Sequence, residues 1–431
     1  MAIKGSGSPM EAVDEYFDML IKSRFIEMFG SYEKNALFND FVVDMIKGPF
    51  GSDIKKSLFV PRSKDTYKVY IQGNAIHNDE SLGDYYISKE YYDQKMYRFQ
   101  VHPKDYIITC DGTMGKYIRL SDDIEPGIIS ASLLKLTVDE SMIMPRFFEI
   151  QWEKEILPSL LSKVRNGCLC HLPSAKVIDK ERVRLPSLEE QKIFVEFVEQ
   201  VDKSKAVCKQ IFQLFDDLVK SRFIELFGTL RNNEKGFKIV TLNEVFPGLT
   251  DGTHQTPTYT EDRENGFKFL SSKDVTSGKI CWDNIKYIPP ELHEELQKRV
   301  SPKRGDILLA KNGTTGVCAK VDTDEIFDIY VSLALLRQTG EYNVDYLVAA
   351  INSPETKIQF NENLKGIGVP NLHLGEIKKT KILAPPRELQ DSFAKFVEQV
   401  DKSKFVETVK PDHPAVFQNI HGFPSFGLIS T

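Results

Sequence analysis

The chain has 431 residues, of which 41% are hydrophobic and 27% are charged, and its formal net charge is −6. This length predicts two or three domains, and the composition excludes a disordered or fibrous chain. The longest apolar runs fall short of the roughly 18 residues that a transmembrane helix needs, and the mild acidity argues against a protein that coats nucleic acid by bulk charge. Six scattered cysteines are typical of reduced thiols, so we expect a cytoplasmic protein.

Helical and strand-rich segments alternate along the chain. Residues 1–10 are small and polar and lack the apolar segment of a secretory signal, so we interpret them as a leader or a cloning scar. In two long segments Gly, Pro, Asn and Asp separate short β-branched and aromatic runs, which predicts mostly antiparallel sheets with a few helices, an α+β fold class. In chain order we predict the leader (1–10), a helix (11–30), a strand-rich domain (31–185), a long helix (186–228), a second strand-rich domain (229–385), a helix (386–407) and an irregular tail (408–431).

The chain contains a long internal repeat. The nine letters FVEQVDKSK occur twice, and FDMLIKSRFIEMFG matches FDDLVKSRFIELFG at 11 of 14 positions. The matched pairs are 197–205 with 396–404, 17–30 with 215–228, 104–115 with 305–316, and 129–135 with 331–337. The two helical motifs are continuous in the middle of the chain but separated at its ends, so the duplication is circularly permuted.

Residues 187–228 have the pattern of one long helix that packs in a bundle. No Gly or Pro interrupts the segment before Gly228, and at 1.5 Å per residue it would be roughly 60 Å long. Ser187 and Glu190 fit a capping box, and Gly228 fits a C-terminal stop. Apolar residues recur every seven positions, at Phe194, Val201, Cys208 and Phe215.

The helical connectors match closely, whereas the two strand-rich domains have diverged. The helices predicted at 11–30 and 386–407 carry the same apolar stripe as the long helix, so we expect both to pack against it. The C-terminal one should run antiparallel to it, giving long antiparallel coiled-coil-like helices and a pseudo-twofold molecule. The simplest interpretation of a constant scaffold with two diverged domains is one rigid spacer that carries two different readers, that is, two recognition domains.

A set of short motifs recurs in the same order in both strand-rich domains. In the second domain they read DGTHQTP, FKFLSSKDVTSGKI, GDILLAKNGTTG, LKGIGVPNLHLGEIKK and ILAPPRELQ. Their counterparts in the first are IKGPFGS, VYIQGNAI, KDYIITCDGTMG, VRNGCLCHLPSAKV and VRLPSLEEQ. Over about residues 11–405 these motifs, with their permuted order, resemble the specificity (S) subunit of type I restriction–modification enzymes. The tail after residue 405 and the loop 167–171 (GCLCH) depart from the family pattern.

The resemblance implies a non-catalytic DNA-reading subunit. Each domain would be a target recognition domain for one half of a bipartite, asymmetric sequence in double-stranded DNA. The helices would fix the gap between the half-sites and dock two modification (M) subunits, which methylate adenine. S-adenosylmethionine, ATP and Mg are expected on the M subunits and on recruited restriction (R) subunits. This chain itself is expected to bind no cofactor or metal and no membrane.

Candidate DNA-binding residues lie in loops and basic clusters of both domains. Residues 47–68 contain six basic side chains against two acidic ones, and residues 298–311 contain five against one. Either cluster alone is more typical of a solvated face, but their presence in both domains favours DNA. The glycine-containing loops 111–115 and 312–316 allow close approach to a phosphate, although a hairpin turn with positive φ predicts the same glycines.

The candidates include Thr253 and His254, which we expect in an exposed loop, where a turn-stabilising role is about as well supported. Arg or Lys suits guanine, and Asn or Gln suits adenine. The full set is Lys47, Ser52, Lys55, Lys56, Gln72, Asn74, Asp111, Thr113, Arg165, Asn166, Thr253, His254, Ser272, Lys273, Lys311, Asn312, Thr314, Lys365, Asn371 and His373.

The sequence offers no self-contained catalytic site of the expected kinds. Neither Pro289–Pro290 nor Pro385–Pro386 has the Asn or Asp and the aromatic residue with which an adenine methyltransferase holds its base, and no Walker A sequence occurs. Asp306 and Lys311 lack a second carboxylate at strand spacing, which disfavours a metal nuclease. The C-x-C-H group at 168–171 has no second cysteine pair nearby for zinc.

Two hypotheses from different classes remain. One is a sequence-specific DNA-binding subunit of a multisubunit enzyme, and the other is a tandem-domain scaffold that binds only proteins. DNA binding in the presence of the methyltransferase partner distinguishes them.

Overall fold

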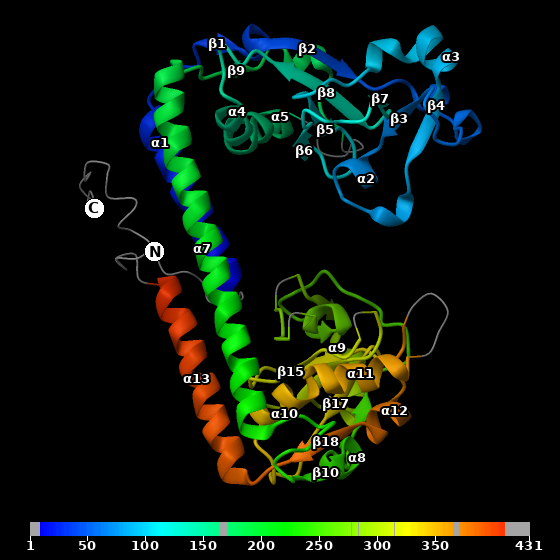
Figure 1. Ribbon diagram of the computed structural model, residues 1–431, viewed down its shortest axis with the longest axis vertical. Helices are drawn as coiled ribbons and strands as arrows, with labels where there is room; N and C mark the ends of the chain where they lie inside the picture. The colour runs from blue at the N-terminus through cyan, green and yellow to red at the C-terminus, as the bar shows by residue number, and fades with distance from the viewer. Residues whose placement is uncertain are drawn as a thin grey trace. The chain divides into compact units, whose positions relative to one another are not determined.

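The computed structural model describes residues 9–163, 171–276, 278–282, 284–313, 315–364 and 370–409, with backbone alone at 9, 11, 80 and 405–409 (Figure 1). Its contacts divide the chain into two compact units, Asp18–Asp202 and Met1–Phe17 with Lys203–Thr431. Each unit mixes helices with sheets, which confirms the predicted α+β class. None of the described helices has both the length and the apolar character that crossing a bilayer requires.

Helix α7 (Leu188–Phe227) is the long helix that the sequence predicted, and it lies in the chain between the two β-rich parts. The Glu190 carboxylate accepts hydrogen bonds from the backbone and the hydroxyl of Ser187, and Ser187 Oγ accepts one from the Glu190 backbone. This reciprocal pattern is the predicted capping box. Gly228 has a φ of 71°, the left-handed conformation that ends a helix, so the predicted stop is also confirmed.

The first β-rich part, which we call the first reader after the prediction from the sequence, lies within Asp18–Asp202 and contains three small sheets; its counterpart in the other unit is the second reader. A four-stranded antiparallel sheet has the order β2 (Val42–Lys47), β8 (Leu133–Val138), β5 (Tyr106–Thr109), β6 (Tyr117–Arg119). A three-stranded sheet has the order β4 (Tyr85–Ser88), β3 (Thr66–Tyr70), β7 (Gly127–Ile129), in which β7 is parallel to β3. A third sheet pairs β1 (Ala36–Leu37) with β9 (Arg182–Val183). The short helices are α2 (Gln72–Ala75), α3 (Lys89–Tyr91), α4 (Pro145–Gln151), α5 (Leu157–Ser162) and α6 (Ala175–Ile178).

The second β-rich part repeats this strand order. Its four-stranded sheet is β11 (Thr250–Asp251), β17 (Leu333–Leu336), β14 (Ile307–Ala310), β15 (Cys318–Lys320), and its three-stranded sheet is β13 (Lys286–Ile288), β12 (Phe267–Leu270), β16 (Phe327–Ile329). Strand β10 (Lys238–Thr241) pairs with β18 (Lys381–Ala384). The helices are α8 (Leu242–Val245), α9 (Pro290–Arg299), α10 (Val344–Ile351), α11 (Pro354–Glu362) and α12 (Leu374–Lys379). The duplication inferred from the sequence is therefore a duplication of fold.

The strand register corrects one of the sequence pairings. Residues 129–135 were paired with 331–337, an offset of 202. In the structure the Cys110 amide donates to the carbonyl oxygen of Ser132 at 2.8 Å, and the Lys311 amide donates to that of Ser332 at 2.9 Å. Because Cys110 and Lys311 are themselves equivalent, Ser132 corresponds to Ser332. The equivalent residues are thus 200 apart. The error was two residues because a slip of two keeps the in-and-out alternation of a strand, so the letters alone do not fix the register.

In each unit a quartet of aromatic rings joins two connector helices to the reader. In the first, Phe25, Phe29, Phe147 and Phe194 pack with ring centroids 5.3–6.0 Å apart. In the second, the equivalent set is Phe223, Phe227, Tyr346 and Phe393, with centroids 4.7–5.8 Å apart. Burying each such ring contributes about 1.5–3 kcal/mol. The quartets anchor the connector helices to α4 in the first reader and to α10 in the second.

Both shorter connector helices run antiparallel to α7. In the first unit, Arg24 of α1 (Pro9–Phe29) stacks over Phe197, and Phe25 packs on Phe194. As α1 proceeds toward its C-terminus, its contacts therefore shift toward the N-terminus of α7. In the other unit, α13 (Arg387–Val409) contacts α7 from Phe393 on Phe227 to Lys404 on Asp216. The antiparallel packing predicted for the C-terminal helix is confirmed. Residues 1–8 and the tail from 410 lie outside the described residues.

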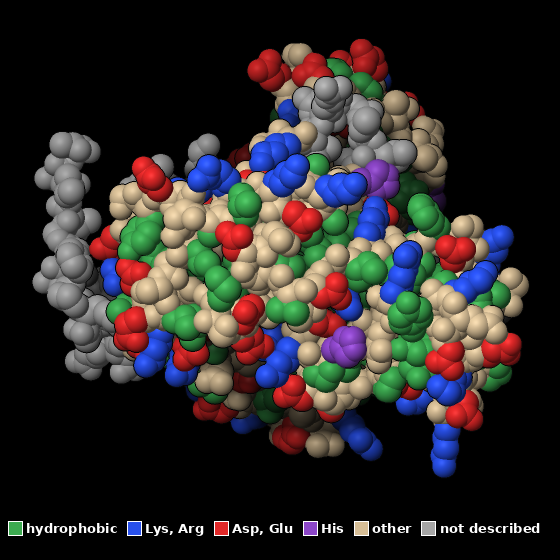
Figure 2. Space-filling model, turned by 90° about the horizontal axis from the view of Figure 1, so that it is seen from above, with side chains coloured by type: hydrophobic (Ala, Val, Ile, Leu, Met, Phe, Trp, Pro, Cys, Tyr) green, Lys and Arg blue, Asp and Glu red, His purple; other side chains and the backbone are tan. Residues whose placement is uncertain are grey.

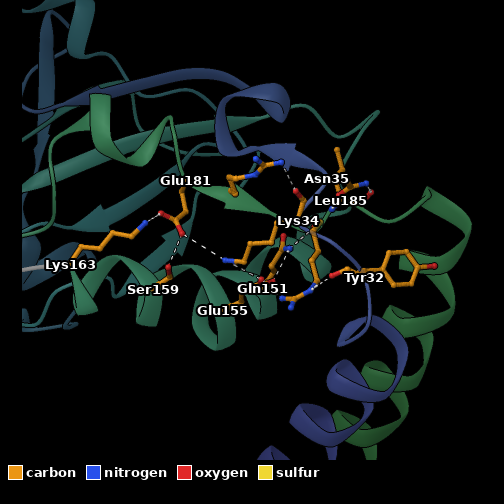
Figure 3. Close-up of polar contacts among 11 residues, drawn as sticks. Tyr32, Lys34, Asn35, Gln151, Glu155, Ser159, Lys163, Glu181 and Leu185 are labelled. Carbon is orange, nitrogen blue, oxygen red and sulfur yellow. Dashed lines mark hydrogen bonds and ion pairs between the residues drawn. The ribbon is translucent and has the colours of Figure 1, made fainter.

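A buried ionic network fixes the neck of the first reader, where the chain enters through β1 and leaves through β9 (Figure 3). The Glu181 carboxylate is buried and accepts hydrogen bonds from Lys163 and, at 2.7 Å, from Ser159. Lys34 lies 3.7 Å from Glu155 and 3.9 Å from Glu181, and Glu155 also pairs with Arg184. Burial acts to raise the pKa of Glu181, but its hydrogen bonds with Lys163 and Ser159 outweigh burial and lower it. The network therefore keeps Glu181 ionised.

Candidate nucleic-acid interface

The glycine-containing loops form tight hairpin ends in both readers. Gly112 and Gly115 follow β5 with φ of 69° and 78°, and Gly313 and Gly316 follow β14 with φ of 74° and 79°. A Cβ on Gly115 would lie 2.4 Å from Leu157. The turn itself thus requires these glycines. Their proposed approach to a phosphate stays a prediction.

The structure brings two of the predicted residues, Gln72 and Thr113, into contact in the first reader, and a third, Asp111, lies at the same hairpin end. Gln72 Nε2, at the start of α2, lies 3.2 Å from Thr113 Oγ1 at the hairpin end, and both lie about 3 Å from His77 Nε2 (3.1 and 3.0 Å). Asp111 pairs with the ring of His171, and their backbones form an isolated antiparallel bridge. We call Gln72, His77, Asp111, Thr113 and His171 the first loop cluster.

Neither His77 nor His171 was among the residues predicted from the sequence to bind DNA. His171 belongs to the loop in which Cys and His departed from the family pattern, and that departure was the available signal. His77 gave no signal, because only the fold of the loop after α2 brings it to the hairpin. Cys168 and Cys170, the other members of the C-x-C-H group, lie outside the described residues. Among the residues that the structure describes, no group of His, Cys, Asp or Glu side chains could hold a metal ion.

The second reader has an equivalent loop end with different side chains. Asn312 and Asn371 form an isolated antiparallel bridge in the place of Asp111 and His171. The amide of Ser272, the counterpart of Gln72, donates to Ser332 Oγ at 3.0 Å. The carboxamide oxygens of Asn312 and Asn371 are shielded from solvent and accept no hydrogen bond from any residue that the structure describes. We call Ser272, Asn312 and Asn371 the second loop cluster.

Lys311 does not face outward from this loop end. Its ammonium is buried and lies 2.8 Å from Asp251 Oδ2, while Arg299 and His254 approach the other oxygen of Asp251 at 3.1 and 3.2 Å. Burial acts to raise the pKa of Asp251, but the hydrogen bond and charge of Lys311, and then those of His254, lower it.. Asp251 is thus a carboxylate that neutralises its cationic neighbours. Lys311 is its buried ion-pair partner and so stabilises the fold at this place.

The corresponding positions of the first reader carry a different charge. Strand register places Lys47 opposite Leu134 and Asp251 opposite Ala334, so Lys47 stands where the second reader has Asp251. The counterpart of Lys311 is Cys110, whose thiol pKa burial raises to about 11. Lys47 is therefore an exposed cation in the first reader, while the equivalent place in the second is a buried anion.

The other predicted residues are distributed as follows. Thr253 is only 7% exposed and its amide bonds to Ile329, so the expectation that it lies in an exposed loop is wrong. This follows from the pairing of its backbone with Tyr330 beside β16. His254 is exposed as expected. The Asn74 amide donates to Gly83 and Asp84, which holds the loop after α2. The exposed candidates also include Ser52, Lys55, Lys56, Lys273 and His373, and those outside the described residues are Arg165, Asn166, Thr314 and Lys365.

Much of the basic excess is neutralised locally. Arg62 pairs with Glu125, Lys68 with Asp84, and Arg304 with Asp324. On the face drawn in Figure 2, Lys and Arg side chains are interspersed with Asp and Glu side chains. Lys47, Lys55, Lys56 and Lys64 have no described carboxylate within ion-pair distance, so the unpaired charge of the first cluster gathers in residues 47–64.

Comparisons with known proteins found similarity to type I restriction specificity subunits. The family model described as the type I restriction modification DNA specificity domain matches residues 234–411. The chain is 24% identical over 364 residues to the type I restriction enzyme MjaVIII specificity subunit of Methanocaldococcus jannaschii, an alignment that covers 77% of this chain and 83% of the relative. It is 25% identical over 335 residues to the EcoBI specificity subunit of Escherichia coli, covering 70% and 68%.

A solved type I restriction–modification S subunit from M. genitalium aligns over 92% of this chain and 99% of that one, at 14% identity and a TM-score of 0.38. Because this score is low, the similarity to specificity subunits rests on the sequence matches. The match to the DNA specificity domain lies in the second repeat. The chain is accordingly similar to specificity subunits of type I restriction–modification systems.

Proposed function

We propose that this chain is a non-catalytic specificity subunit of a type I restriction–modification system and that it reads a bipartite, asymmetric DNA sequence, one half-site per reader. The observation that carries the proposal is the repetition of one strand order with two different loop ends. Equivalent positions hold Asp111 and His171 in one reader and Asn312 and Asn371 in the other. Because base edges differ in their donors and acceptors, readers with different side chains at the same place select different sequences.

In this proposal α7 sets the gap between the half-sites and carries the docking surface for two M subunits. Its 40 residues correspond to about 60 Å of continuous helix. Val207, Leu214 and Leu218 recur along it at helical spacing and are 49%, 67% and 48% exposed. Exposed apolar side chains in such a row are typical of a surface that another protein covers.

The chemistry would then belong to the partners. The M subunits would bring S-adenosylmethionine and methylate adenine, and the R subunits would bring ATP and Mg. Because the proposed substrate is chromosomal DNA, the complex would work in the cytoplasm. Little of the binding energy needs to come from net charge on this chain, because the partner subunits can supply phosphate contacts that are independent of sequence.

The test is reconstitution of the full chain with its M subunits on genomic DNA that lacks methylation. We expect methylated adenine at a single split motif with a fixed gap, detected by long-read sequencing of modified bases. Native mass spectrometry should give two M subunits for each S chain. If the assembled complex protects no DNA and leaves no motif methylated, the proposal fails and the chain is a scaffold for proteins.

A further inference from the structure

The two readers place one residue pair at the same structural position. Asp111 follows β5 and Asn312 follows β14, and each forms an antiparallel bridge with a residue of a later loop, His171 or Asn371. The next hydrogen bond also repeats, because Leu172 donates to Cys110 at 2.8 Å and Leu372 donates to Lys311 at 2.7 Å. The backbone at this place is the same in both readers, and only the side chains differ.

The side chains of the two pairs have different hydrogen-bonding states. Asp111 and His171 bond to one another through Oδ1 and Nδ1, which leaves ring atom Nε2 of His171 for another partner. Asn312 and Asn371 make no side-chain hydrogen bond to any described residue, and the carboxamide oxygen of each is without a donor. An unpaired, shielded acceptor destabilises a fold, so two of them at one loop end call for a ligand that supplies donors.

The partner chemistry follows from the carboxamide group. A carboxamide offers one acceptor and two donors, and rotation of its terminal bond exchanges the positions of oxygen and nitrogen. Both residues are half-buried and their oxygens are shielded, so turning the terminal bond over is the step that would present each oxygen to a ligand at the surface. Adenine presents an amine donor beside a ring-nitrogen acceptor in the major groove, which is the complement of a carboxamide.

We propose that the pairs Asp111–His171 and Asn312–Asn371 are the specificity-determining positions of the two readers, and that the asparagine pair selects adenine. This inference rests on the proposed function, because it assumes that each reader faces a half-site. It goes further in assigning one base type to one pair of residues. In the pair Asp111–His171, Oδ1 of Asp111 and Nδ1 of His171 are bonded to one another, so this pair offers different groups from a carboxamide. It therefore selects a different base in the other half-site.

The test uses the S chain assembled with its M subunits and compares methylated motifs. Replacing the pair by Asn312→Ala and Asn371→Ala should remove the requirement for adenine at one position of one half-site. Specific binding should fall about tenfold or more, as for loss of one bidentate base contact. The unfolding temperature should not fall, because these carboxamides hold no other side chain. Asn361→Ala, on the exposed part of α11, is the matched control and should change neither motif nor affinity.

The reciprocal change, Asp111→Asn with His171→Asn, should add an adenine requirement to the other half-site and leave the gap unchanged. An unchanged motif in both double variants overturns the inference. Loss of binding together with an equal loss of stability also overturns it, because the asparagines would then be structural. If the unmodified complex methylates no split motif, the proposed function itself has failed, so the two failures are distinguishable.

Discussion

Lys311 Nζ lies 2.8 Å from Asp251 Oδ2, and both side chains are less than one-tenth exposed. This pair links β11 to the residue that follows β14, beneath the loop end of the second reader. Arg299 donates to the carbonyl oxygen of Gly252 at 3.0 Å as well as to Asp251, so the same cluster holds the chain as it leaves β11. Lys311 thus forms a buried ion pair beneath the loop end, and the DNA contact expected of it stays a prediction.

Lys311→Met should therefore destabilise the second reader. Removing one partner of a buried ion pair leaves an uncompensated charge, which typically costs about 3–5 kcal/mol, and Arg299 should keep the loss near the lower value. Denaturant unfolding of the full chain measures it. Lys273→Met, whose side chain is 57% exposed, is the control and should change stability by about 0.5 kcal/mol or less. Unchanged stability with weakened DNA binding would show instead that Lys311 is a reader.

Glu234 gives a prediction for pH. Hydrogen bonds from the Thr229 backbone, its own backbone and the Asn232 side chain lower the pKa of Glu234 from 4.5 to about 2. Because the folded pKa is below the unfolded one, ionised Glu234 stabilises the fold above about pH 4.5, and this contribution disappears as the pH falls toward about 2. The stability difference between the unmodified chain and Glu234→Gln should therefore shrink on acidification.

Urea unfolding of both proteins at several pH values between about 3 and 7 would measure that difference. Glu264→Gln, at an exposed position in another turn of the same unit, is the matched control. A difference that stays constant over this range would contradict the assigned role of Glu234 in closing the turn after α7.

The aromatic quartets predict separate effects on the two units. Phe194 and Phe393 occupy equivalent places and are fully buried. Phe194→Ala should lower the stability of unit 18–202, and Phe393→Ala that of the other unit, each by about 3–5 kcal/mol. Hydrogen exchange followed by mass spectrometry resolves the units, and Leu214→Ala, at an exposed site on α7, is the control. Equal loss of protection in both units from either variant would contradict independent anchoring.

The connector helices could be predicted closely because their information is local. The capping pair Ser187 and Glu190, the stop at Gly228 and an uninterrupted apolar stripe all lie within one segment. The α+β class of the readers was also predictable, since short runs and turn residues indicate strands without requiring their partners. The strand order was beyond this reasoning, because pairing β3 with the parallel strand β7 depends on contacts far apart in sequence.

The candidate site could be predicted only in part, for the same reason. Asp111 and Asn312 were found because a glycine turn follows each of them. Whether a polar side chain faces outward depends on what packs beneath it, and the sequence did not reveal that Asp251 would reach Lys311 across 60 positions. The partnership of Asp111 with His171 likewise arises from a bridge between two loops, which no local pattern encodes.

The proposed role of α7 as a spacer leads to the last prediction. Four residues of helical sequence inserted at Gln210, an exposed position, would lengthen α7 by about 6 Å, or roughly two base pairs of DNA at 3.4 Å per step. The complex should then methylate the same two half-sites with a gap changed by about that amount. The same insertion at Gly236, in a turn where a Cβ would meet no other atom, should leave the gap unchanged. A gap that stays the same after both insertions would mean that the M subunits, and not α7, set the distance between half-sites.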